Sequence, residues 1–174
     1  MEITAGMVKA LREETGAGIM DCKRALSDTG GDVEKARVIL REKGLASAAK
    51  KESRETSQGL VEVYIHGGGR IGAMVELNCE TDFVARTDEF KSLARDIAMQ
   101  VVAMNPRFVS PEAASAEIIA AEELSDEDVK NASITTQAYF RDQRQTVGEK
   151  IKEVIAKSGE NIRVRRFERY ELGR

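Results

Sequence analysis

Two runs of alternating residues, separated by three consecutive glycines, constrain the fold of this chain more than any other feature. Within residues 61–66 and again within residues 71–77, apolar side chains recur at every second position. This period predicts two strands, and the glycines predict a tight turn between them. They do not indicate a phosphate loop, because no helix start or Lys-Ser/Thr pair follows. We expect a hairpin with one apolar face covered by helices, made of Val61, Val63, Ile65, Ile71, Ala73, Val75 and Leu77.

Residues 1–45 have the pattern of three short helices. Thr4 and Asp32 stand where N-caps are expected, and Gly44 is expected to end the third helix. The buried stripe of that third helix is expected to be Val33, Ala36, Ile39 and Leu40. A unit of this size is only marginally stable alone and is typical of a docking module.

Residues 46–58 contain no large apolar side chain, and we interpret them as a solvated, partly helical linker. Residues 59–174 then form the core domain, which begins with the hairpin. After the hairpin we expect a long helix capped by Thr87 and exposed helices within residues 111–133.

The last part of the core domain is predicted to be a helix followed by a closing strand. Thr146 and Glu149 form a capping box at the start of the helix. The closing strand changes phase between Val164 and Phe167, which suggests a bulge. Helices first, then hairpin, helices and a final strand predict an α+β fold with an antiparallel sheet of about three strands.

Charge and composition argue against several classes of function. The formal net charge is -3, so no overall positive field attracts nucleic acid. No apolar run approaches the roughly 18 residues that span a membrane, and the first residues lack a secretion signal. We therefore expect a cytoplasmic protein without membrane contact. Cys22 and Cys79 are far apart in the sequence and are expected to be reduced thiols.

The residues that carry chemistry form no catalytic pattern. His66 is the only histidine, and no Ser/His/Asp set can be assembled around it. No His/Cys cluster has the spacing of metal ligands. We therefore expect a chain that is not an enzyme, needs no cofactor or metal, and functions by binding.

Residues 76–86 (Glu-Leu-Asn-Cys-Glu-Thr-Asp-Phe-Val-Ala-Arg) place a carboxylate and an aromatic ring together where a strand passes into a helix. Two interpretations are open. Either Phe83 folds beneath the turn as core and Asp82 serves as a cap, or Phe83 is an anchor that a partner covers. Physical reasoning alone favours the buried Phe83, because an exposed aromatic ring in a loop is costly without a partner.

This segment resembles the second signature of the elongation factor Ts family. Residues 11–26 (Leu-Arg-Glu-Glu-Thr-Gly-Ala-Gly-Ile-Met-Asp-Cys-Lys-Arg-Ala-Leu) resemble the first signature, and residues 159–170 resemble the family's closing strand. Three motifs in the family's order argue strongly against chance, although residues 111–145 match weakly. Long members of the family carry two related core halves, whereas this chain has space for one.

The resemblance implies a factor that binds elongation factor Tu, both GDP-bound and nucleotide-free, and promotes release of GDP. The N-terminal module is similar to ubiquitin-associated domains. It is implied to dock on the GTPase domain of the partner through Arg12, Ile19 and Met20. A core role for Ile19 and Met20 stays open.

The resemblance also implies a role for the turn made of Thr81, Asp82, Phe83 and Val84. This turn is implied to reach the partner's nucleotide site. There Phe83 would wedge between helices of the partner and Asp82 would disturb the bound magnesium, while the flanking residues shape the turn.

A homodimer is expected from the sheet. The predicted hairpin leaves a second face formed by Leu60, Tyr64 and Met74 beside Glu62, Glu76 and His66. That face is too apolar to meet water and fits a two-fold contact between two sheets, in which a second copy replaces the missing core half. The alternative is that residues 111–145 fold over this face in the monomer.

Two other functions compete with this interpretation. One is RNA or ribosome binding through four arginines of the closing strand, Arg163, Arg165, Arg166 and Arg169. Glutamates at 160, 168 and 171 interrupt that patch, so we expect no direct contact with nucleic acid. The other is a ubiquitin-associated adaptor, which leaves most of the chain unexplained.

Overall fold

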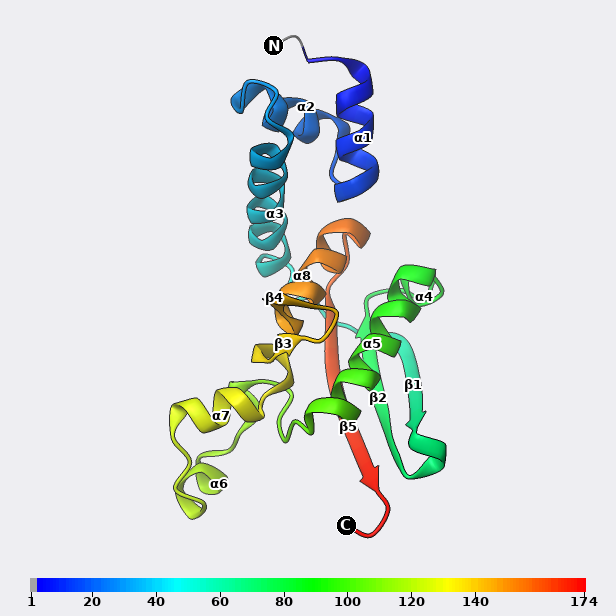
Figure 1. Ribbon diagram of the computed structural model, residues 1–174, viewed down its shortest axis with the longest axis vertical. Coiled ribbons are helices and arrows are strands. Elements are labelled where there is room, and N and C mark those ends of the chain that lie inside the picture. Colours follow the sequence, from blue (N-terminus) through cyan, green and yellow to red (C-terminus); the bar gives the residue numbers. More distant parts are fainter. Residues whose placement is uncertain (1–2) are drawn as a thin grey trace. The chain divides into compact units, whose positions relative to one another are not determined.

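The computed structural model describes residues 3–174, which begin with helices and continue into a core that contains a sheet (Figure 1). The predicted α+β class is confirmed. The chain divides into two compact units, one of Met1–Arg54 with Lys152–Asn161 and the other of Glu55–Ile151 with Ile162–Arg174.

Three helices open the first unit: α1 (Ala5–Thr15), α2 (Ile19–Asp28) and α3 (Val33–Ala49). Their ends follow from local chemistry. The Thr4 hydroxyl accepts a hydrogen bond from the Met7 amide, and the Asp32 carboxylate accepts one from the Lys35 amide. Gly16 ends α1 in the left-handed conformation, with φ of 69°. The N-caps predicted at Thr4 and Asp32 are confirmed.

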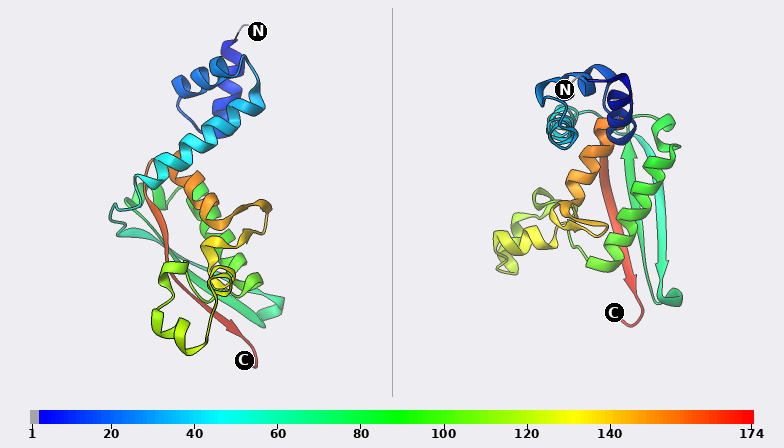
Figure 2. Two further views of the ribbon diagram at one scale, coloured as in Figure 1. Left: turned by 90° about the vertical axis from the view of Figure 1, so that its left-hand side faces the viewer. Right: turned by 45° about the horizontal axis from the view of Figure 1, so that its top comes forward.

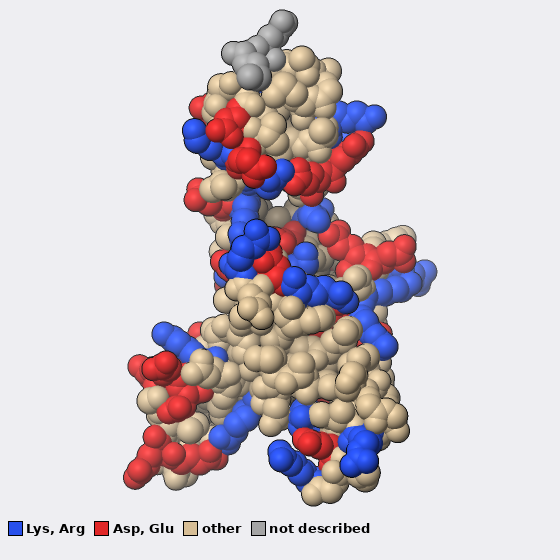
Figure 3. Space-filling view, in the orientation of Figure 1, with Lys and Arg blue, Asp and Glu red and all other residues tan. Residues whose placement is uncertain are grey.

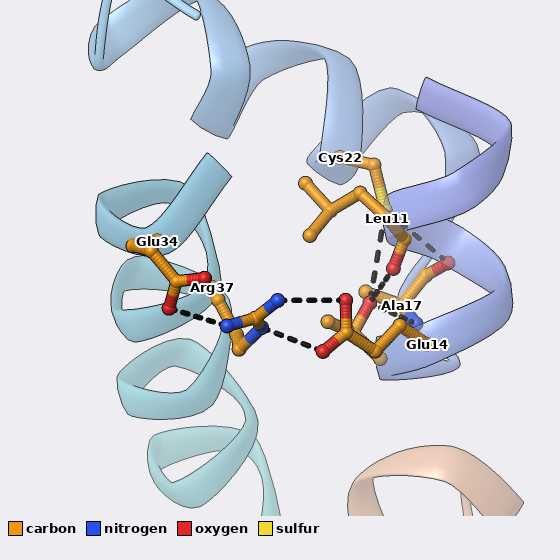
Figure 4. A network of polar contacts seen from close by, with 7 residues as sticks. Leu11, Glu14, Ala17, Cys22, Glu34 and Arg37 are labelled. Atoms are coloured by element: carbon orange, nitrogen blue, oxygen red, sulfur yellow. Dashed lines mark hydrogen bonds and ion pairs between the residues drawn. The ribbon is translucent and has the colours of Figure 1, made fainter. Parts of the chain in front are cut away.

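A small apolar core joins these helices. It consists of Val8, Leu11, Cys22, Ala25, Leu26, Ala36 and Leu40. At its edge Arg37 of α3 lies between Glu14 of α1 and Glu34 of its own helix (Figure 4), with Arg37 Nη2 2.9 Å from Glu14 Oε2. Cys22 in this core and Cys79 in the second unit are both free thiols and fully buried.

Two expectations for α3 are wrong. The helix does not end at Gly44 but continues to Ala49, because Ala and Leu dominate the following residues and favour a helix. Gly44 serves close packing instead, since a Cβ placed on it would lie 3.1 Å from the Ala156 Cβ. Ile39 is 38% exposed rather than buried, because it lies on the flank of the line formed by Leu40 and Gly44.

The second unit is built on a three-stranded antiparallel sheet in the order β1–β2–β5. The strands are β1 (Gln58–His66), β2 (Ile71–Cys79) and β5 (Ile162–Glu171). Helix α5 (Asp88–Met104) lies along one face of this sheet and packs on β1 and β2 (Figure 1; Figure 2). The expected cap of α5 is confirmed, because Thr87 accepts a hydrogen bond from the Phe90 amide. The helix buries Phe90, Leu93, Ile97 and Val101.

The hairpin's predicted apolar face is wrong for β1. The turn at Gly67–Gly69 places His66 opposite Ile71, so odd-numbered residues of β1 lie opposite even-numbered residues of β2. Val63 therefore pairs with Met74, and Tyr64 pairs with Ala73. Residues directly opposite each other share a face of the sheet. Val61, Val63 and Ile65 consequently lie on the face opposite to Ala73, Val75 and Leu77.

The face of β2 that carries Ala73, Val75 and Leu77 is buried. On the same side of β1, Tyr64 lies beneath the Arg95 guanidinium, 4.7 Å from the centre of its ring. Glu62 also meets Arg95, at 2.9 Å. Tyr64 and Glu62 therefore contact α5, contrary to the expectation that they lie on the second, uncovered face of the hairpin.

We define the free face of the sheet as the side turned away from α5, formed by Val61, Val63, Ile65, Met74 and Tyr170. These side chains are 45–70% exposed. The alternative in which residues 111–145 fold over the second face of the sheet is therefore wrong.

β5 contains the predicted bulge. Leu77 lies opposite Val164 whereas its neighbour Glu76 lies opposite Arg166, so Arg165 is the extra residue. The bulge explains why the apolar phase of this strand changes along its length.

Between α5 and α8 (Val147–Ser158) the chain makes an excursion with helices α6 (Ala116–Ala121) and α7 (Asp126–Ala132). These two helices confirm the prediction for residues 111–133. They pack around their own cluster of Phe108, Ala114 and Val129. Backbone hydrogen bonds close the base of the excursion, from the Phe108 amide to the Ala132 carbonyl at 3.0 Å and from the Ile134 amide to the Phe108 carbonyl at 2.9 Å. Acidic side chains gather over α6 and α7 (Figure 3).

A second hairpin, β3 (Ala138–Tyr139) and β4 (Asp142–Thr146), follows the excursion and was not predicted. Its strands are too short to show a period. Thr146 at the end of β4 forms the expected capping box with Glu149 at the start of α8.

A polar network anchors this second hairpin to α5. The Tyr139 hydroxyl donates to Asp96 Oδ2 at 2.5 Å, and Arg141 Nε donates to Asp96 Oδ1 at 2.8 Å. Gln100 accepts a hydrogen bond from the Phe140 amide at 3.0 Å. Burial, together with the hydrogen bond to Asp96, raises the pKa of the Tyr139 hydroxyl.

Tyr139→Phe should lower the free energy of unfolding at pH 7 by roughly 1–3 kcal/mol, because a buried hydrogen bond to a carboxylate is lost. The pKa of Tyr139 is higher in the folded than in the unfolded state, so this contribution is complete below the unfolded value of about 10. It is lost as the pH rises through the folded pKa. Urea unfolding should show the wild-type advantage at pH 7 and a smaller one above pH 10.

Tyr64→Phe is the control for this experiment, since it removes a hydroxyl whose hydrogen bond to His66 is exposed. Equal stability of wild type and Tyr139→Phe at pH 7 would contradict the anchoring role of the network.

Candidate functional site

A one-turn helix, α4 (Asp82–Ala85), connects the central strand β2 to α5 and contains most of the turn singled out in the sequence. Thr81 caps it, with its hydroxyl 3.5 Å from the Val84 amide. Before the cap, the buried Cys79 thiol donates to the Thr81 carbonyl at 3.1 Å. After the turn, the Thr87 hydroxyl donates to the Val84 carbonyl at 2.8 Å. The turn is thus tied at both ends to the strand and helix that flank it.

Phe83 points from this turn into solvent. It is 78% exposed, the largest value among the exposed large apolar residues in the described part of the chain. Ala85, not Phe83, is the residue buried beneath the turn. The alternative that makes Phe83 a core residue is therefore wrong, and the turn presents an uncovered aromatic ring.

Asp82 precedes Phe83 and forms an ion pair with Arg86, its Oδ2 lying 2.6 Å from Arg86 Nη2. No role is predicted for Arg86 from the sequence. The spacing of four residues, with the acid on the N-terminal side, is the signal that could have identified the pair.

The residues expected to dock on a partner are exposed as well. Arg12 lies on the surface of α1, and Ile19 and Met20 open α2 with exposed fractions of 57% and 65%. The alternative that places Ile19 and Met20 in the core is wrong. Val38 on α3 is 55% exposed and was missed, because it lies outside every motif. The turn with Phe83 belongs to the second compact unit, and these docking residues belong to the first.

Ion pairs within the sheet hold most arginines of the RNA-binding alternative. Arg165 and Arg166 both reach Glu76, with Arg166 Nε 2.7 Å from a Glu76 oxygen. Partial burial opposes ionisation, yet hydrogen bonding to Arg166 keeps the pKa of Glu76 below its usual value. Arg169 pairs with Glu171 at 2.9 Å. These contacts leave fewer charges to follow phosphates than the sequence suggests.

The chemistry offered by the turn is that of a binding surface. An aromatic ring, a carboxylate and a guanidinium stand side by side, with no nucleophile and base paired among them. Within residues 3–174, no group of three or more His, Cys, Asp or Glu is placed to hold a metal ion. Over the same residues, no helix combines the length and the apolar character needed to cross a membrane.

Comparison with known proteins agrees with the motifs. A family model described as "Elongation factor TS" matches residues 32–140. The chain is 50% identical to the elongation factor Ts of Desulforamulus reducens, across 99% of this chain and 90% of that protein. It is 49% identical to the elongation factor Ts of Coprothermobacter proteolyticus, across 99% of this chain and 100% of that protein. It is 52% identical to the elongation factor Ts of Syntrophomonas wolfei, across 98% of this chain and 91% of that protein.

The family model matches more than half of the chain, and the relatives match nearly all of it. The three motifs and the exposed turn stand in the order expected from the resemblance. The chain belongs to the elongation factor Ts family.

Proposed function

We propose that the turn of Thr81, Asp82, Phe83 and Val84 is the part of this chain that loosens GDP in elongation factor Tu. As a member of the elongation factor Ts family, the chain is a nucleotide exchange factor for elongation factor Tu and is not an enzyme. The observation that supports the role of the turn is the 78% exposure of Phe83 on a segment that hydrogen bonds hold at both ends. In this proposal Phe83 wedges between helices of the partner, and Asp82 disturbs the magnesium ion.

Exchange of this kind needs only differential binding. A factor that binds nucleotide-free elongation factor Tu more tightly than the GDP-bound form must weaken GDP binding by the same factor. Magnesium supplies much of the positive charge that holds the phosphates of a bound nucleotide, so a change among its ligands loosens the nucleotide. A turn fixed before binding suits this role, because little conformational freedom is lost on contact.

The helical module supplies docking energy in this proposal. Ile19 and Met20 present apolar surface at the start of α2, and Arg12 adds a cation on α1. Covering this surface on elongation factor Tu would offset the cost of distorting the nucleotide site. Docking residues should therefore change the concentration of factor needed, and turn residues should change the maximal rate.

Phe83→Ala should lower the maximal rate of GDP release roughly tenfold or more, as expected for an aromatic anchor at an interface. The thermal melt should not move, because the ring is exposed in the free protein. Release of a fluorescent GDP analogue from elongation factor Tu measures the rate. Met104→Ala is the matched control, since Met104 is 51% exposed at the end of α5.

Wild-type exchange by Phe83→Ala would remove the wedge from the mechanism. A loss of roughly 3–5 kcal/mol in the free energy of unfolding, which is typical for truncation of a core Phe, would show that the ring is buried and would contradict the wedge role.

Met20→Ala combined with Ile19→Ala should raise the half-saturating concentration roughly five- to tenfold, since apolar docking contact is lost. The maximal rate should stay close to that of the wild type. Titration of the factor at fixed elongation factor Tu separates the two quantities, and Ile118→Ala, at an exposed apolar residue of α6, is the control. A lower maximal rate without a change in half-saturation would place these residues at the nucleotide site instead.

We also propose that two copies of the chain pair through the free face of the sheet. An antiparallel sheet with one solvated face should alternate to polar residues there. Val63, Ile65 and Met74 instead line an open groove with Tyr170 and Leu172. A two-fold axis would bring the same apolar face of a second copy onto it, sheet against sheet.

Met74→Lys should shift this dimer toward the monomer, because a charge would be buried at the centre of the contact. Sedimentation should give twice 19.2 kDa for the wild type at micromolar concentration and a value near 19.2 kDa for the variant. Met104→Lys introduces the same charge at a similarly exposed methionine outside the free face. A wild-type mass of 19.2 kDa that does not rise on concentration would exclude the dimer.

A further inference from the structure

Arg86 is the single basic residue in an acidic stretch. From position 80 to position 89 the sequence contains four carboxylates, Glu80, Asp82, Asp88 and Glu89, and one cation. Arg86 makes two hydrogen bonds to Asp82, one from its side chain and one from its backbone. Its Nη2 lies 2.6 Å from Asp82 Oδ2, and its backbone amide donates to the Asp82 carbonyl at 3.2 Å. The only positive charge of the stretch is thus placed on the carboxylate that neighbours Phe83.

We propose that Arg86 is a positioning residue for nucleotide exchange, which holds the Asp82 carboxylate on α4 in the orientation that the turn presents to elongation factor Tu. The inference rests on the role proposed above for Asp82 at the magnesium site. Arg86 acts through Asp82 and needs no contact of its own with the partner.

Stability does not account for the pair. The side chains of Arg86 and Asp82 are 76% and 46% exposed, and ion pairs in such surroundings contribute little to folding. The backbone of the turn is already fixed by Thr81, Thr87 and Cys79. The contact instead restricts the rotamers of Asp82, which a bare carboxylate at the start of a one-turn helix would sample freely.

A carboxylate that must meet a metal ion gains from this restriction. Orientation before contact removes an entropic cost that would otherwise fall on the exchange step. The ion pair uses Oδ2 of Asp82. A carboxylate has a second oxygen, so the paired group can still accept a cation.

Arg86 also sets the charge with which the turn approaches the nucleotide. Without Arg86, the negative charge of Asp82 would add to that of the neighbouring carboxylates. The phosphates of the nucleotide would then repel the turn over a screening length of about 8–10 Å. Paired with Arg86, it approaches with compensated charge. The attraction to magnesium then acts at contact, where only the correct orientation is productive.

The test measures release of a fluorescent GDP analogue from elongation factor Tu, at low and at high magnesium, as the factor is titrated. Arg86→Gln should lower the maximal rate several-fold at high magnesium, with the half-saturating concentration nearly unchanged. Arg86→Lys should restore most of the rate, since it retains a cation. In the double variant Asp82→Asn with Arg86→Gln, the second change should add nothing to the first, because the carboxylate that Arg86 orients is gone.

Two controls separate positioning from general effects. Thermal melts of Arg86→Gln and wild type should coincide. Lys91→Gln on α5 removes a nearby positive charge from the same region and should leave the rate unchanged, whereas an equal defect in this variant would assign the effect to overall charge and overturn the inference.

The remaining outcomes are distinct. An Arg86→Gln defect that persists in full beside Asp82→Asn would show direct contact with the partner and overturn the inference. Wild-type exchange by Arg86→Gln, with Asp82→Asn impaired, would overturn it and leave the proposed function standing. Wild-type exchange by Asp82→Asn at every magnesium concentration would refute the role of Asp82 and the inference together.

Discussion

The pairing of β2 along both of its edges determines how the core is arranged. β1 and β5 both run antiparallel to it, and its side chains Ala73, Val75 and Leu77 are at most 3% exposed. A slip of one residue would turn these side chains to the opposite face, so burial fixes the register. The same strand ends at Cys79, whose thiol holds the Thr81 carbonyl. The register of β2 therefore also fixes where the turn with Phe83 leaves the sheet.

Local signals in the sequence predicted most of the elements. N-caps at Thr4, Asp32 and Thr87 and the capping box at Thr146 depend on a side chain and an amide three residues away, so sequence alone identifies them. Such signals do not predict which side chains of the hairpin share a face of the sheet. Alternation gives the period of each strand, but the turn decides which phase of β1 meets β2, and both phases of β1 contain apolar residues. The prediction that Gly44 ends α3 was wrong for a related reason. The glycine is explained by its close contact with Ala156, a residue distant in sequence.

The sequence identified the residues of the candidate site but not how their side chains are arranged. The sequence located the carboxylate and the aromatic ring, and the family resemblance gave them roles, while physical reasoning alone favoured a buried Phe83. Ala85 is the buried side chain of the turn, and the ring of Phe83 lies in solvent. A residue's exposure depends on what packs next to it, and a single sequence does not contain that information. The ion pair of Arg86 was missed because an acid four residues before a base indicates a contact only where the chain is helical, and the one-turn helix at Asp82–Ala85 was not predicted.

The excursion between α5 and α8 has a consequence for how this family can change. Its base is closed by hydrogen bonds between Phe108 and the residues at 132 and 134, and its helices pack on a cluster of their own. The two ends therefore meet at the same place whatever lies between them. Lengthening a closed loop costs little, roughly 0.6 kcal/mol for each doubling. Natural selection can thus add or delete helices here, or a whole domain can be inserted, while the sheet and its turn keep their geometry.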